Sequence, residues 1–334
     1  MNILAIESSC DDTAAAVLTD DGLAANVVSS QLGHAEFGGV VPELASRAHQ
    51  RLIVPVVQEA LGRAGIQKSE VDAVAVTYGP GLAGSLLVGL SFGKALAVGL
   101  DVPLVGVNHL EGHVYSVFLS EPVPAFPYVC LTVSGGHTQL NVVREGFQHE
   151  LLGRTRDDAA GEAFDKVAKM LDLGYPGGPV IDRLAREGNP AFHDFPRTKL
   201  GDFDFSFSGV KTSVLYYLNR LGTDEDRRAF LNDHLADVCA AFQQAVVDVL
   251  VDRVRKAVHD TGIKEVAIVG GVSANSALKR EAREAAEADG FNLYIPPLAF
   301  STDNAAMIAM TARFKLRVGQ TSPLDLAAAP NLAL

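Results

Sequence analysis

The sequence predicts a two-lobed α/β fold made from a duplicated α/β unit. With 334 residues the chain exceeds the usual size of one domain, about 100 to 200 residues. Two stretches follow the same plan: a strand, a tight polar turn and a returning strand, and later a buried strand, a glycine loop and a helix. The composition, 48% hydrophobic and 20% charged, is typical of a globular α/β protein with a large core.

The first copy of this plan begins at the N-terminus. An apolar segment leads through a polar turn into a second apolar segment, which is the pattern of two antiparallel strands. A continuous apolar run further on predicts a buried strand, and the glycines and proline after it predict a loop that ends where a helix starts. The expected elements are strands at 3–7, 14–18 and 74–77, the turn 8–12, the glycine loop 79–81 and a helix from Leu82 onward.

The second copy repeats these elements in the same order. Its expected elements are strands at 129–133, 139–143 and 266–269, the turn 134–137, the glycine pair 270–271 and a helix over 274–288. Because type and order correspond, we expect two related α/β domains.

Two further helices and one aperiodic segment complete the plan. Pro42 suits the first turn of a helix, and Pro55 should kink or divide that helix. Residues 227–258 carry apolar side chains at helical core spacing. Residues 189–208 contain five phenylalanines without periodicity, so they form either a lid or a surface element packed on its own rings.

A pair of histidines follows the apolar run 102–107. If a helix begins after that strand, His109 and His113 share one helical face and both can point at one metal ion. The best third ligand is Asp303, which lies in a segment rich in capping residues before another helix-forming run. Two histidines and one carboxylate leave positions open for substrate, which is typical of catalytic metal sites. For the histidine pair taken alone, two solvated side chains on a helix surface are the commoner explanation.

Two polar turns are candidates for phosphate binding. The turn Ser134-Gly135-Gly136-His137 presents backbone N–H groups and a hydroxyl, whereas the turn 8–13 is acidic. Facing each other across a cleft, they would hold a phosphate or its metal, as in ATPases of the actin and sugar-kinase superfamily. Each is also consistent with an ordinary hairpin turn.

Two glycine loops that lead into helices could supply further nucleotide contacts. They are 177–179 and 270–275, and a helix N-terminus with bare backbone is suited to binding a phosphate or ribose. Asp165 and Asp182 lie on predicted helices near these loops, where a solvated carboxylate is the common case. The chain has neither a GxxxxGK[ST] phosphate loop nor a GxGxxG after an N-terminal strand, which disfavours a dinucleotide dehydrogenase.

Charge and composition limit the partners and the compartment. The formal charge of -12 argues against binding nucleic acid over the whole surface, so a nucleic-acid partner must dock locally or on a second protein. The apolar run 82–100 contains Lys94 and four glycines, which favours a buried helix over a membrane span. Three separated cysteines and an acidic N-terminal strand without a signal peptide suggest a cytoplasmic location. Arg183, Arg186, Arg197 and Lys199 are clustered enough to form a local basic patch, although a solvated charged face is the ordinary interpretation.

Seven motifs run in order through nearly the whole chain. They are ESSCDDT at 7–13, NHLEGH at 108–113, VSGGHT at 133–138, YPGGP at 175–179, FSFSG at 205–209, GGVSAN at 270–275 and STDN at 301–304. Together they resemble the motifs of the bacterial TsaD family, also called Gcp, without departure at a position the family uses.

The resemblance implies a fold, a reaction and partners. The fold would be that of an actin-like ATPase, with residues 1–107 and the helix 304–334 in one lobe and residues 108–303 in a second lobe that carries the metal and adenylate. The reaction would transfer the threonylcarbamoyl group of threonylcarbamoyl-AMP to N6 of the adenosine beside the anticodon of ANN-decoding tRNAs, releasing AMP. The partners would be tRNA, the paralogue TsaB and the ATPase TsaE, with no membrane.

The resemblance also implies roles for individual residues. His109, His113 and Asp303 would bind one divalent metal, Fe²⁺ in preference to Zn²⁺. A proton acceptor for the adenine amine would be either Asp11, in the acidic turn, or water. The adenylate would be held by Thr132, Val133, Ser134, Gly135, Gly136, Asp165, Gly178, Asp182 and Asn275.

Three other functions compete with this one. A metalloprotease of the zincin type needs Glu directly after the first histidine, where this chain has Leu110, and Glu111 is about 200° around the helix from His109. A small-molecule kinase of the same superfamily normally holds magnesium on carboxylates and phosphates rather than on two imidazoles. A nucleotide-dependent scaffold would need no catalytic metal.

Overall fold

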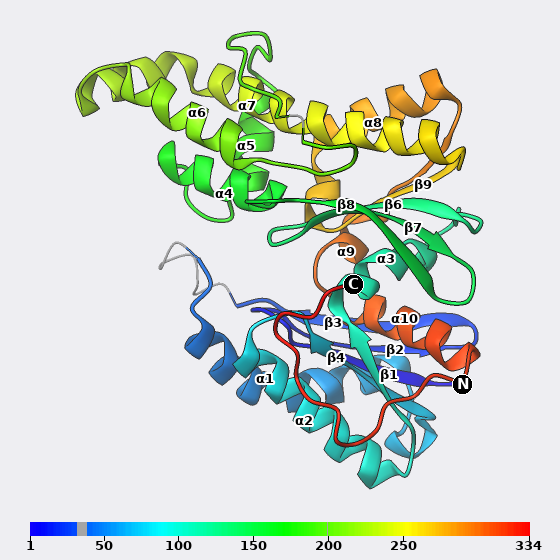
Figure 1. The fold of residues 1–334 in the computed structure, drawn as a ribbon. Helices are drawn as coiled ribbons and strands as arrows, with labels where there is room; N and C mark the ends of the chain where they lie inside the picture. The colour runs from blue at the N-terminus through cyan, green and yellow to red at the C-terminus, as the bar shows by residue number, and fades with distance from the viewer. Residues whose placement is uncertain (32–38, 199) are drawn as a thin grey trace. The chain divides into compact units, whose positions relative to one another are not determined.

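The computed structural model describes residues 1–31, 39–198 and 200–334. The chain divides into two compact units, one formed by residues 1–123 and 296–334 and the other by residues 124–295 (Figure 1). Each unit contains one five-stranded sheet. We call them unit 1 and unit 2.

In unit 1 the strands lie in the order β3-β2-β1-β4-β5. The strand β1 is antiparallel to β2 and parallel to β4, so that Ile3 lies opposite Leu18 on one side and Ala73 on the other. The three central strands are apolar almost throughout because helices cover both faces of the sheet. Their bounds are β1 (Ile3–Glu7), β2 (Thr13–Thr19), β3 (Gly22–Ser29), β4 (Ala73–Gly79) and β5 (Leu104–Asn108).

Two long helices cover one face of this sheet and a third covers the other (Figure 1). Leu4 and Ile6 of β1 pack with Ile53 and Val57 of α1 and with Leu90 of α2 in one core. The alternate residues of β1 face α10, because successive side chains of a strand point to opposite faces. The helices of unit 1 are α1 (Pro42–Ala64), α2 (Ala83–Leu100), α3 (His109–Tyr115), α9 (Leu298–Ser301) and α10 (Ala305–Arg317), with short 3-10 turns η2 (Lys68–Glu70) and η3 (Ser116–Leu119).

Unit 2 repeats this sheet strand for strand. Its order β8-β7-β6-β9-β10 matches that of unit 1. The strand β6 corresponds to β1, since it is antiparallel to β7 on one side and parallel to β9 on the other. This correspondence confirms the predicted α/β duplication. The strands are β6 (Tyr128–Val133), β7 (Thr138–Arg144), β8 (Gln148–Arg154), β9 (Glu265–Val269) and β10 (Asn292–Tyr294).

The helices of unit 2 lie over one face of its sheet (Figure 1). Leu131 and Leu140 of the sheet pack with Phe164 of α4 and Phe242 of α7, whose rings are in edge contact at 5.2 Å. The helices are α4 (Ala160–Met170), α5 (Gly177–Ala185), α6 (Ser208–Asn219), α7 (Asp224–Thr261) and α8 (Ser276–Asp289), with the 3-10 turn η4 (Gly271–Ala274).

Three details differ from the sequence predictions or decide between them. Pro55 does not divide its helix, because α1 is continuous from Pro42 to Ala64. The described part of 189–208 packs its rings into the core of unit 2, where Phe195 and Phe205 are fully buried, so it is a packed surface element. Lys199, which the basic patch included, lies outside the described residues.

The division into units also differs from the predicted boundaries at 107 and 303. The segment that carries both histidines belongs to unit 1, because α3 packs against α10. The rings of Tyr115 and Phe314 are 4.7 Å apart, and a Cβ on Gly112 would lie 2.9 Å from Ile308 Cδ1. The metal-ligand candidates are therefore all residues of unit 1.

Two helices, α2 and α7, are long and apolar enough to cross a membrane, by length and composition only. In α7, 67% of the apolar window is buried inside unit 2, and in α2 the buried face contains Leu86 and Leu90. Core helices pass the same test of length and composition, so these helices are weak evidence for a membrane span.

A partly buried ion-pair network joins α4 to α6 in unit 2. Asp158 Oδ1 accepts from Lys166 Nζ at 2.7 Å, and Asp158 Oδ2 accepts from Lys211 Nζ at 2.6 Å. Burial raises the pKa of Asp158, but the two lysines outweigh burial and lower the pKa to about 2. The ionised carboxylate therefore stabilises the fold above the ordinary aspartate pKa, and this contribution is lost as the pH falls from about 4 towards 2.

We expect Asp158→Asn to lower the free energy of unfolding at pH 7 by about 2 kcal/mol, since it removes hydrogen bonds to charged groups. Urea unfolding of both proteins across pH 2 to 7 checks this, and the difference should shrink to nothing near pH 2. In the double variant Asp158→Asn, Lys211→Met, the second change should cost little more. A difference independent of pH would contradict the ion-pair explanation.

Candidate functional site

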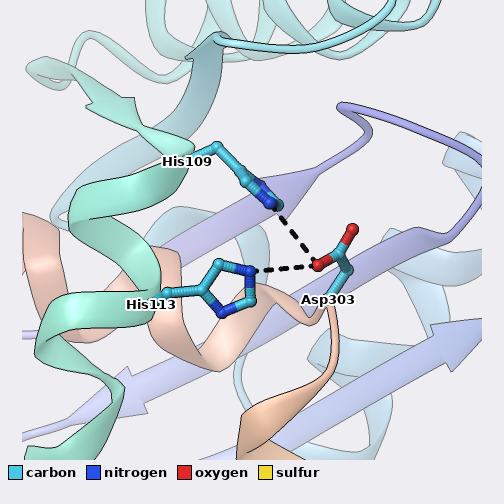
Figure 2. Close-up of side chains that lie close together, drawn as sticks. All are labelled: His109, His113 and Asp303. Carbon is cyan, nitrogen blue, oxygen red and sulfur yellow. Dashed lines mark ion pairs between the residues drawn. The ribbon is translucent and has the colours of Figure 1, made fainter. Parts of the chain in front are cut away.

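Two histidines and one aspartate converge in unit 1, as the sequence predicted. Asp303 Oδ1 lies 3.2 Å from His113 Nε2 and 3.4 Å from His109 Nε2 (Figure 2). One potential ligand atom from each residue lies within 4.8 Å of the other two. The two imidazoles are almost fully buried, whereas the Asp303 side chain keeps 29% of its surface exposed, so the cluster is open on the carboxylate side.

The helix α3 sets the direction of both imidazoles. It begins directly after β5, with Asn108 as its N-cap and His109 as its first residue. Asn108 Oδ1 accepts from Leu110 N at 2.8 Å, and Glu111 Oε2 accepts from Asn108 N at 3.4 Å, which completes a capping box. His113 follows one turn later, so its ring lies 4.8 Å from that of His109 on the same helical face.

Asp303 is held between two helix ends. Asn304 caps α10 by accepting from Met307 N at 3.0 Å, and its amide donates to Thr302 O at 2.7 Å. Ser301 Oγ donates to Pro296 O at 3.0 Å and so fixes the end of α9. Only Thr302 and Asp303 lie between Ser301 and Asn304, which restricts where the Asp303 carboxylate can point.

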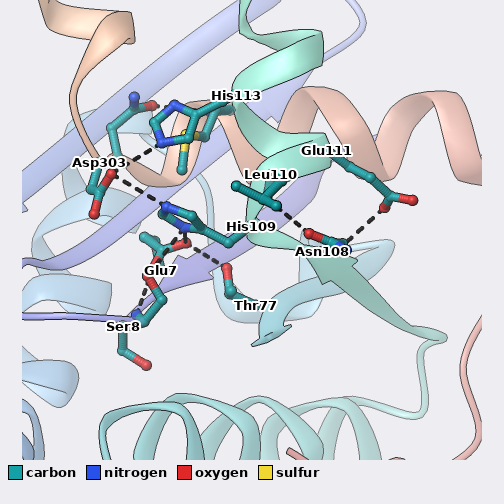
Figure 3. A network of polar contacts seen from close by, with 12 residues as sticks. Glu7, Ser8, Thr77, Asn108, His109, Leu110, Glu111, His113 and Asp303 are labelled. Carbon is teal, nitrogen blue, oxygen red and sulfur yellow. Dashed lines mark hydrogen bonds and ion pairs between the residues drawn. The ribbon is translucent and has the colours of Figure 1, made fainter. Parts of the chain in front are cut away.

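A fourth residue, Glu7, supports the cluster from below and was not assigned a role from the sequence. Its carboxylate is fully buried at the end of β1 and accepts from Ser9 N and Thr77 Oγ1, each at 2.5 Å (Figure 3). Glu7 Oε2 also lies 3.2 Å from His109 Nδ1, and Ser9 Oγ lies 3.1 Å from the same nitrogen. A carboxylate is only an acceptor, so His109 Nδ1 carries a proton towards Glu7, and Nε2, which faces the Asp303 carboxylate, would become a metal ligand when a cation replaces its proton.

The charges of these groups depend on one another. Burial lowers the pKa of His109, but the carboxylates of Asp303 and Glu7 outweigh burial and raise it well above its ordinary value. Burial raises the pKa of Asp303, but His109 and His113 outweigh burial and hold it well below the usual range. The pKa of Glu7 is likewise lowered by His109 despite burial. Two ionised carboxylates therefore flank one imidazole, and the site favours positive charge.

The donor set fits a first-row divalent metal ion. Both ring nitrogens of His113 are buried, and among the described residues Nδ1 has no hydrogen-bond partner while Nε2 has only the Asp303 carboxylate at 3.2 Å. An unpaired buried imidazole nitrogen is unfavourable unless something accepts its lone pair. Ligand atoms 2.0 to 2.1 Å from a tetrahedral metal stand about 3.3 Å apart, which is close to both separations from Asp303. Two imidazoles and a carboxylate suit iron or zinc better than magnesium.

The geometry does not suit a zincin protease. Leu110 is buried in the core, and Glu111 points away from the cluster to pair with Lys315 Nζ at 2.8 Å (Figure 3). The acidic turn that carries Asp11 contacts the cluster through Ser9, while His49 Nε2 holds the same turn at Cys10 O, 3.0 Å away. Asp11 itself is partly exposed in this turn.

The residues expected to hold an adenylate lie in unit 2 around three helix N-termini. Gly161, in the first turn of α4, lies against the 134–137 turn, where its N donates to Ser134 O at 3.2 Å. Asp165, one turn along α4, accepts from Gly177 N at the start of α5 at 2.7 Å. These contacts bring the turn and two helix N-termini together.

The third N-terminus, that of α8, is joined to α5 by Asp182. Asp182 Oδ1 accepts from Ser276 N at 3.0 Å and from Ser276 Oγ at 2.7 Å. Asn275 caps α8 by accepting from Leu278 N, and its amide donates to Gln243 Oε1 at 2.7 Å. The predicted residues therefore share one region, and several of their polar atoms already hold the helix ends in place.

In this region the backbone at Gly270 packs closely against β6, whereas the backbone at Gly135, Gly136 and Gly271 borders open space. Gly270 has a φ of +91°, and a Cβ there would lie 2.5 Å from Val133 O, so only glycine fits beside β6. A Cβ on Gly135, Gly136 or Gly271 would meet nothing within 4 Å. Thr132 and Val133, at the end of β6, are buried. The open backbone at the turn and at η4 is where an anion could approach.

The predicted basic patch is largely neutralised. Arg186 pairs with Asp182 at 2.8 Å, and Arg197 pairs with Asp248 at 2.8 Å. Because their charges are paired within the protein, Arg186 and Arg197 do not identify a nucleic-acid-binding surface.

Comparisons with known proteins identify the family of this chain. Residues 22–310 match the family model of TsaD, tRNA N6-adenosine threonylcarbamoyltransferase. Proteins of that name are similar to this chain in Salinibacter ruber (63% identity, all of both chains) and Symbiobacterium thermophilum (54% identity, 99% of this chain and 96% of the relative).

Solved structures show the same fold at low sequence identity. Full-length HypF in its phosphate- and nucleotide-bound form covers 95% of this chain and 46% of HypF, with a TM-score of 0.64 and 13% identity. The activator of 2-hydroxyisocaproyl-CoA dehydratase from Clostridium difficile covers 95% of this chain and 97% of the activator, with a TM-score of 0.52 and 14% identity. Both have the actin-like ATPase fold. The two five-stranded sheets of this chain, which share one strand order, therefore belong to an actin-like α/β fold.

Proposed function

Because the chain belongs to the TsaD family of tRNA N6-adenosine threonylcarbamoyltransferases, we propose that it transfers the threonylcarbamoyl group of threonylcarbamoyl-AMP to N6 of the adenosine beside the anticodon of tRNA, releasing AMP. The observation that carries this proposal is the convergence of His109, His113 and Asp303 in a chain whose relatives carry that name. The reaction is an acyl transfer to a weak nucleophile, since the lone pair of the adenine amine is delocalised into the ring.

His109, His113 and Asp303 would hold one divalent metal ion, Fe²⁺ in preference to Zn²⁺, since two imidazoles and one carboxylate with open positions are typical of non-haem iron sites. Such an ion, when bound, supplies Lewis-acid polarisation of the carbamoyl oxygen. Glu7 keeps the proton of His109 on Nδ1, so that Nε2 is available as a ligand. The exposed side of Asp303 leaves room for substrate at this centre.

The adenylate would bind to unit 2. Backbone N–H groups of Gly135 and Gly136 and the hydroxyl of Ser134 would hold the phosphate, which suits AMP as a leaving group, while Ser134 N closes the turn on His137 O at 2.8 Å. Positioning of this kind can supply about 7 to 11 kcal/mol of the barrier. The proton lost from N6 would go to Asp11 or to water. The other contacts would come from Thr132, Val133, Asp165, Gly178, Asp182 and Asn275.

We expect Gly161→Ala to weaken binding of the adenylate without affecting the metal. A Cβ at this position would lie 2.5 Å from Ser134 O and 2.7 Å from Gly135 Cα, so the phosphate-binding turn must move. The KM for threonylcarbamoyl-AMP should rise about tenfold while metal affinity in unit 1 stays the same. Steady-state kinetics with metal titration checks this. Gly62→Ala, where a Cβ meets nothing within 4 Å, is the control.

Partners and location complete the proposal. The net charge of -12 disfavours tRNA binding by this chain alone, so the TsaB paralogue and the ATPase TsaE would contribute to docking of the tRNA. The protein would act in the cytoplasm, where its tRNA substrate is found.

Mass spectrometry of tRNA nucleosides tests the proposal. tRNA is incubated with threonine, bicarbonate, ATP and the partner enzymes, with and without this chain, and threonylcarbamoyladenosine should form only with it. Formation without the chain would contradict the proposal. A phosphorylated sugar formed from ATP would instead support the kinase alternative.

A further inference from the structure

After α10, residues 318–334 run as an extended segment across unit 1, which we call the C-terminal strap. Figure 1 shows it as the red trace that ends at the mark C. It is held along its length by main-chain hydrogen bonds to the sheet and to the β4–α2 loop. These are Ser322 N to Leu104 O (2.8 Å), Ala329 N to Tyr78 O (2.7 Å) and Gly81 N to Pro330 O (3.0 Å).

The strap lies against two glycines that admit no side chain. A Cβ on Gly79 would stand 2.1 Å from Ala329 O, and a Cβ on Gly106 would stand 2.5 Å from Leu326 Cδ2. Gly79 ends the inner strand β4 and Gly106 lies within the edge strand β5, and glycine in a strand costs stability unless another segment approaches closely. The strap therefore packs against the sheet at two positions where the absence of a side chain leaves room for it.

The end of the strap reaches the N-cap of α3. Asn108 Nδ2 donates to Ala333 O at 2.8 Å, while Asn108 Oδ1 accepts from Leu110 N at 2.8 Å. Both ends of one amide group are thus used, one by the helix and one by the strap.

The strap contact and the helix N–H favour the same orientation of the amide. An asparagine amide has one acceptor end and one donor end, and only the acceptor end can cap a helix. The carbonyl of Ala333 needs a donor, so it holds Nδ2 on its own side and leaves Oδ1 facing Leu110 N. Without that carbonyl, Leu110 N–H alone holds the amide, and the cap loses one of the two hydrogen bonds that fix its side chain.

We propose that the strap is a positioning element for the metal centre, acting through Ala333 O and Asn108 on His109. This inference rests on the proposed metal site. His109 directly follows Asn108, so the backbone of the cap sets the direction of the first ligand. The helix has only 7 residues and little stability of its own, so its first turn depends on such contacts.

Cobalt binding tests this proposal, because the visible absorption of bound Co²⁺ reports its ligands. Two variants, called the link variants below, remove the hydrogen bond between Asn108 and Ala333, one by losing the donor and the other by losing the acceptor. Asn108→Ser keeps a good N-cap oxygen but loses the amide donor, and a chain that ends at Leu332 loses the acceptor at Ala333. A chain that ends at Ala333 is the matched control, because its terminal carboxylate still offers an acceptor oxygen.

We expect each link variant to bind Co²⁺ about tenfold more weakly than the full chain, with an altered absorption spectrum, as for other contacts that orient a metal ligand. The combined variant should be no weaker than either one, because both remove the same hydrogen bond. The control chain should bind like the full chain. Thermal unfolding without metal identifies any variant that fails to fold, and Asn108→Ser then decides the question alone.

The outcomes separate this inference from the proposed function. Equal affinity and spectra in the full chain and in both link variants would overturn the role of the strap while leaving the metal site intact. Additive losses in the combined variant would also overturn it. If the full chain shows no Co²⁺ binding that depends on Asp303, the metal site itself is wrong, and the inference fails with it.

Discussion

Asp303→Asn is expected to reduce threonylcarbamoyl transfer at least about 1000-fold, because the variant loses a charged metal ligand but keeps the shape of the side chain. Lewis-acid stabilisation of a developing oxyanion is worth several kcal/mol, and each 1.4 kcal/mol corresponds to a factor of ten in rate. The amide cannot balance the charge of a divalent ion between two neutral imidazoles. His113→Ala should have a similar effect.

The measurement is formation of threonylcarbamoyladenosine in tRNA under single-turnover conditions, together with metal content. Thr302→Ala is the control, since its side chain is exposed next to Asp303 and should leave the rate unchanged. If Asp303→Asn keeps more than a tenth of the rate, the metal centre is not catalytic. Intact tRNA modification in cells that carry this variant would favour the scaffold alternative.

Glu7→Gln should weaken metal binding about 10- to 100-fold, although Glu7 is not itself a predicted ligand. Three donors point at its two carboxylate oxygens: Ser9 N at Oε1, and Thr77 Oγ1 and His109 Nδ1 at Oε2. A glutamine amide has one acceptor oxygen, so its NH₂ group must face at least one of these donors. If it faces His109, the ring must move its proton to Nε2, which then cannot bind a metal.

Competition of the protein with a chelator for Zn²⁺ or Co²⁺ measures this loss. Glu111→Gln is the matched control, because Glu111 faces Lys315 on the other side of α3 and glutamine also completes a capping box. Equal metal affinity in Glu7→Gln and the wild-type protein would show that Glu7 does not orient His109. A similar loss in Glu111→Gln would point to helix stability instead.

The predictable part of this protein was local. Apolar segments bounded by polar turns predicted both hairpins, because each strand needs only its own alternation and a turn sequence. The spacing of His109 and His113 predicted a shared helical face, since that follows from the helical period. Asp303 was found by its residue type in a capping segment, and the structure brings it to both imidazoles.

The role of Glu7 could not be derived from local pattern. Its partners Thr77 and His109 are 70 and 102 residues away in sequence, and they meet only because β1 pairs with β4 and β4 pairs with β5. One signal was present: Glu7 is the only charged residue in an otherwise apolar buried strand. A buried carboxylate must find donors, so such a position is a candidate for function.

The compact units divide after residue 123 and before residue 296, rather than at the predicted 107 and 303, for a related reason. A break between Val107 and Asn108 is reasonable from the sequence, because a buried strand ends there. The packing of Tyr115 against Phe314, however, depends on α10, almost 200 residues later in the chain. Sequence patterns along one segment carry no information about which distant helix covers it.

By itself, the sequence determined the duplicated α/β plan, the helical face of the two histidines and the family, because these depend on periodicity, residue type and motif order. Only the tertiary structure decided that Glu7 fixes the tautomer of His109, that the strap reaches Asn108 and that three helix N-termini meet in unit 2. Each of these is a hydrogen bond between segments far apart in the chain. Such contacts arise from the packing of sheets and helices, which a local pattern of residues does not specify.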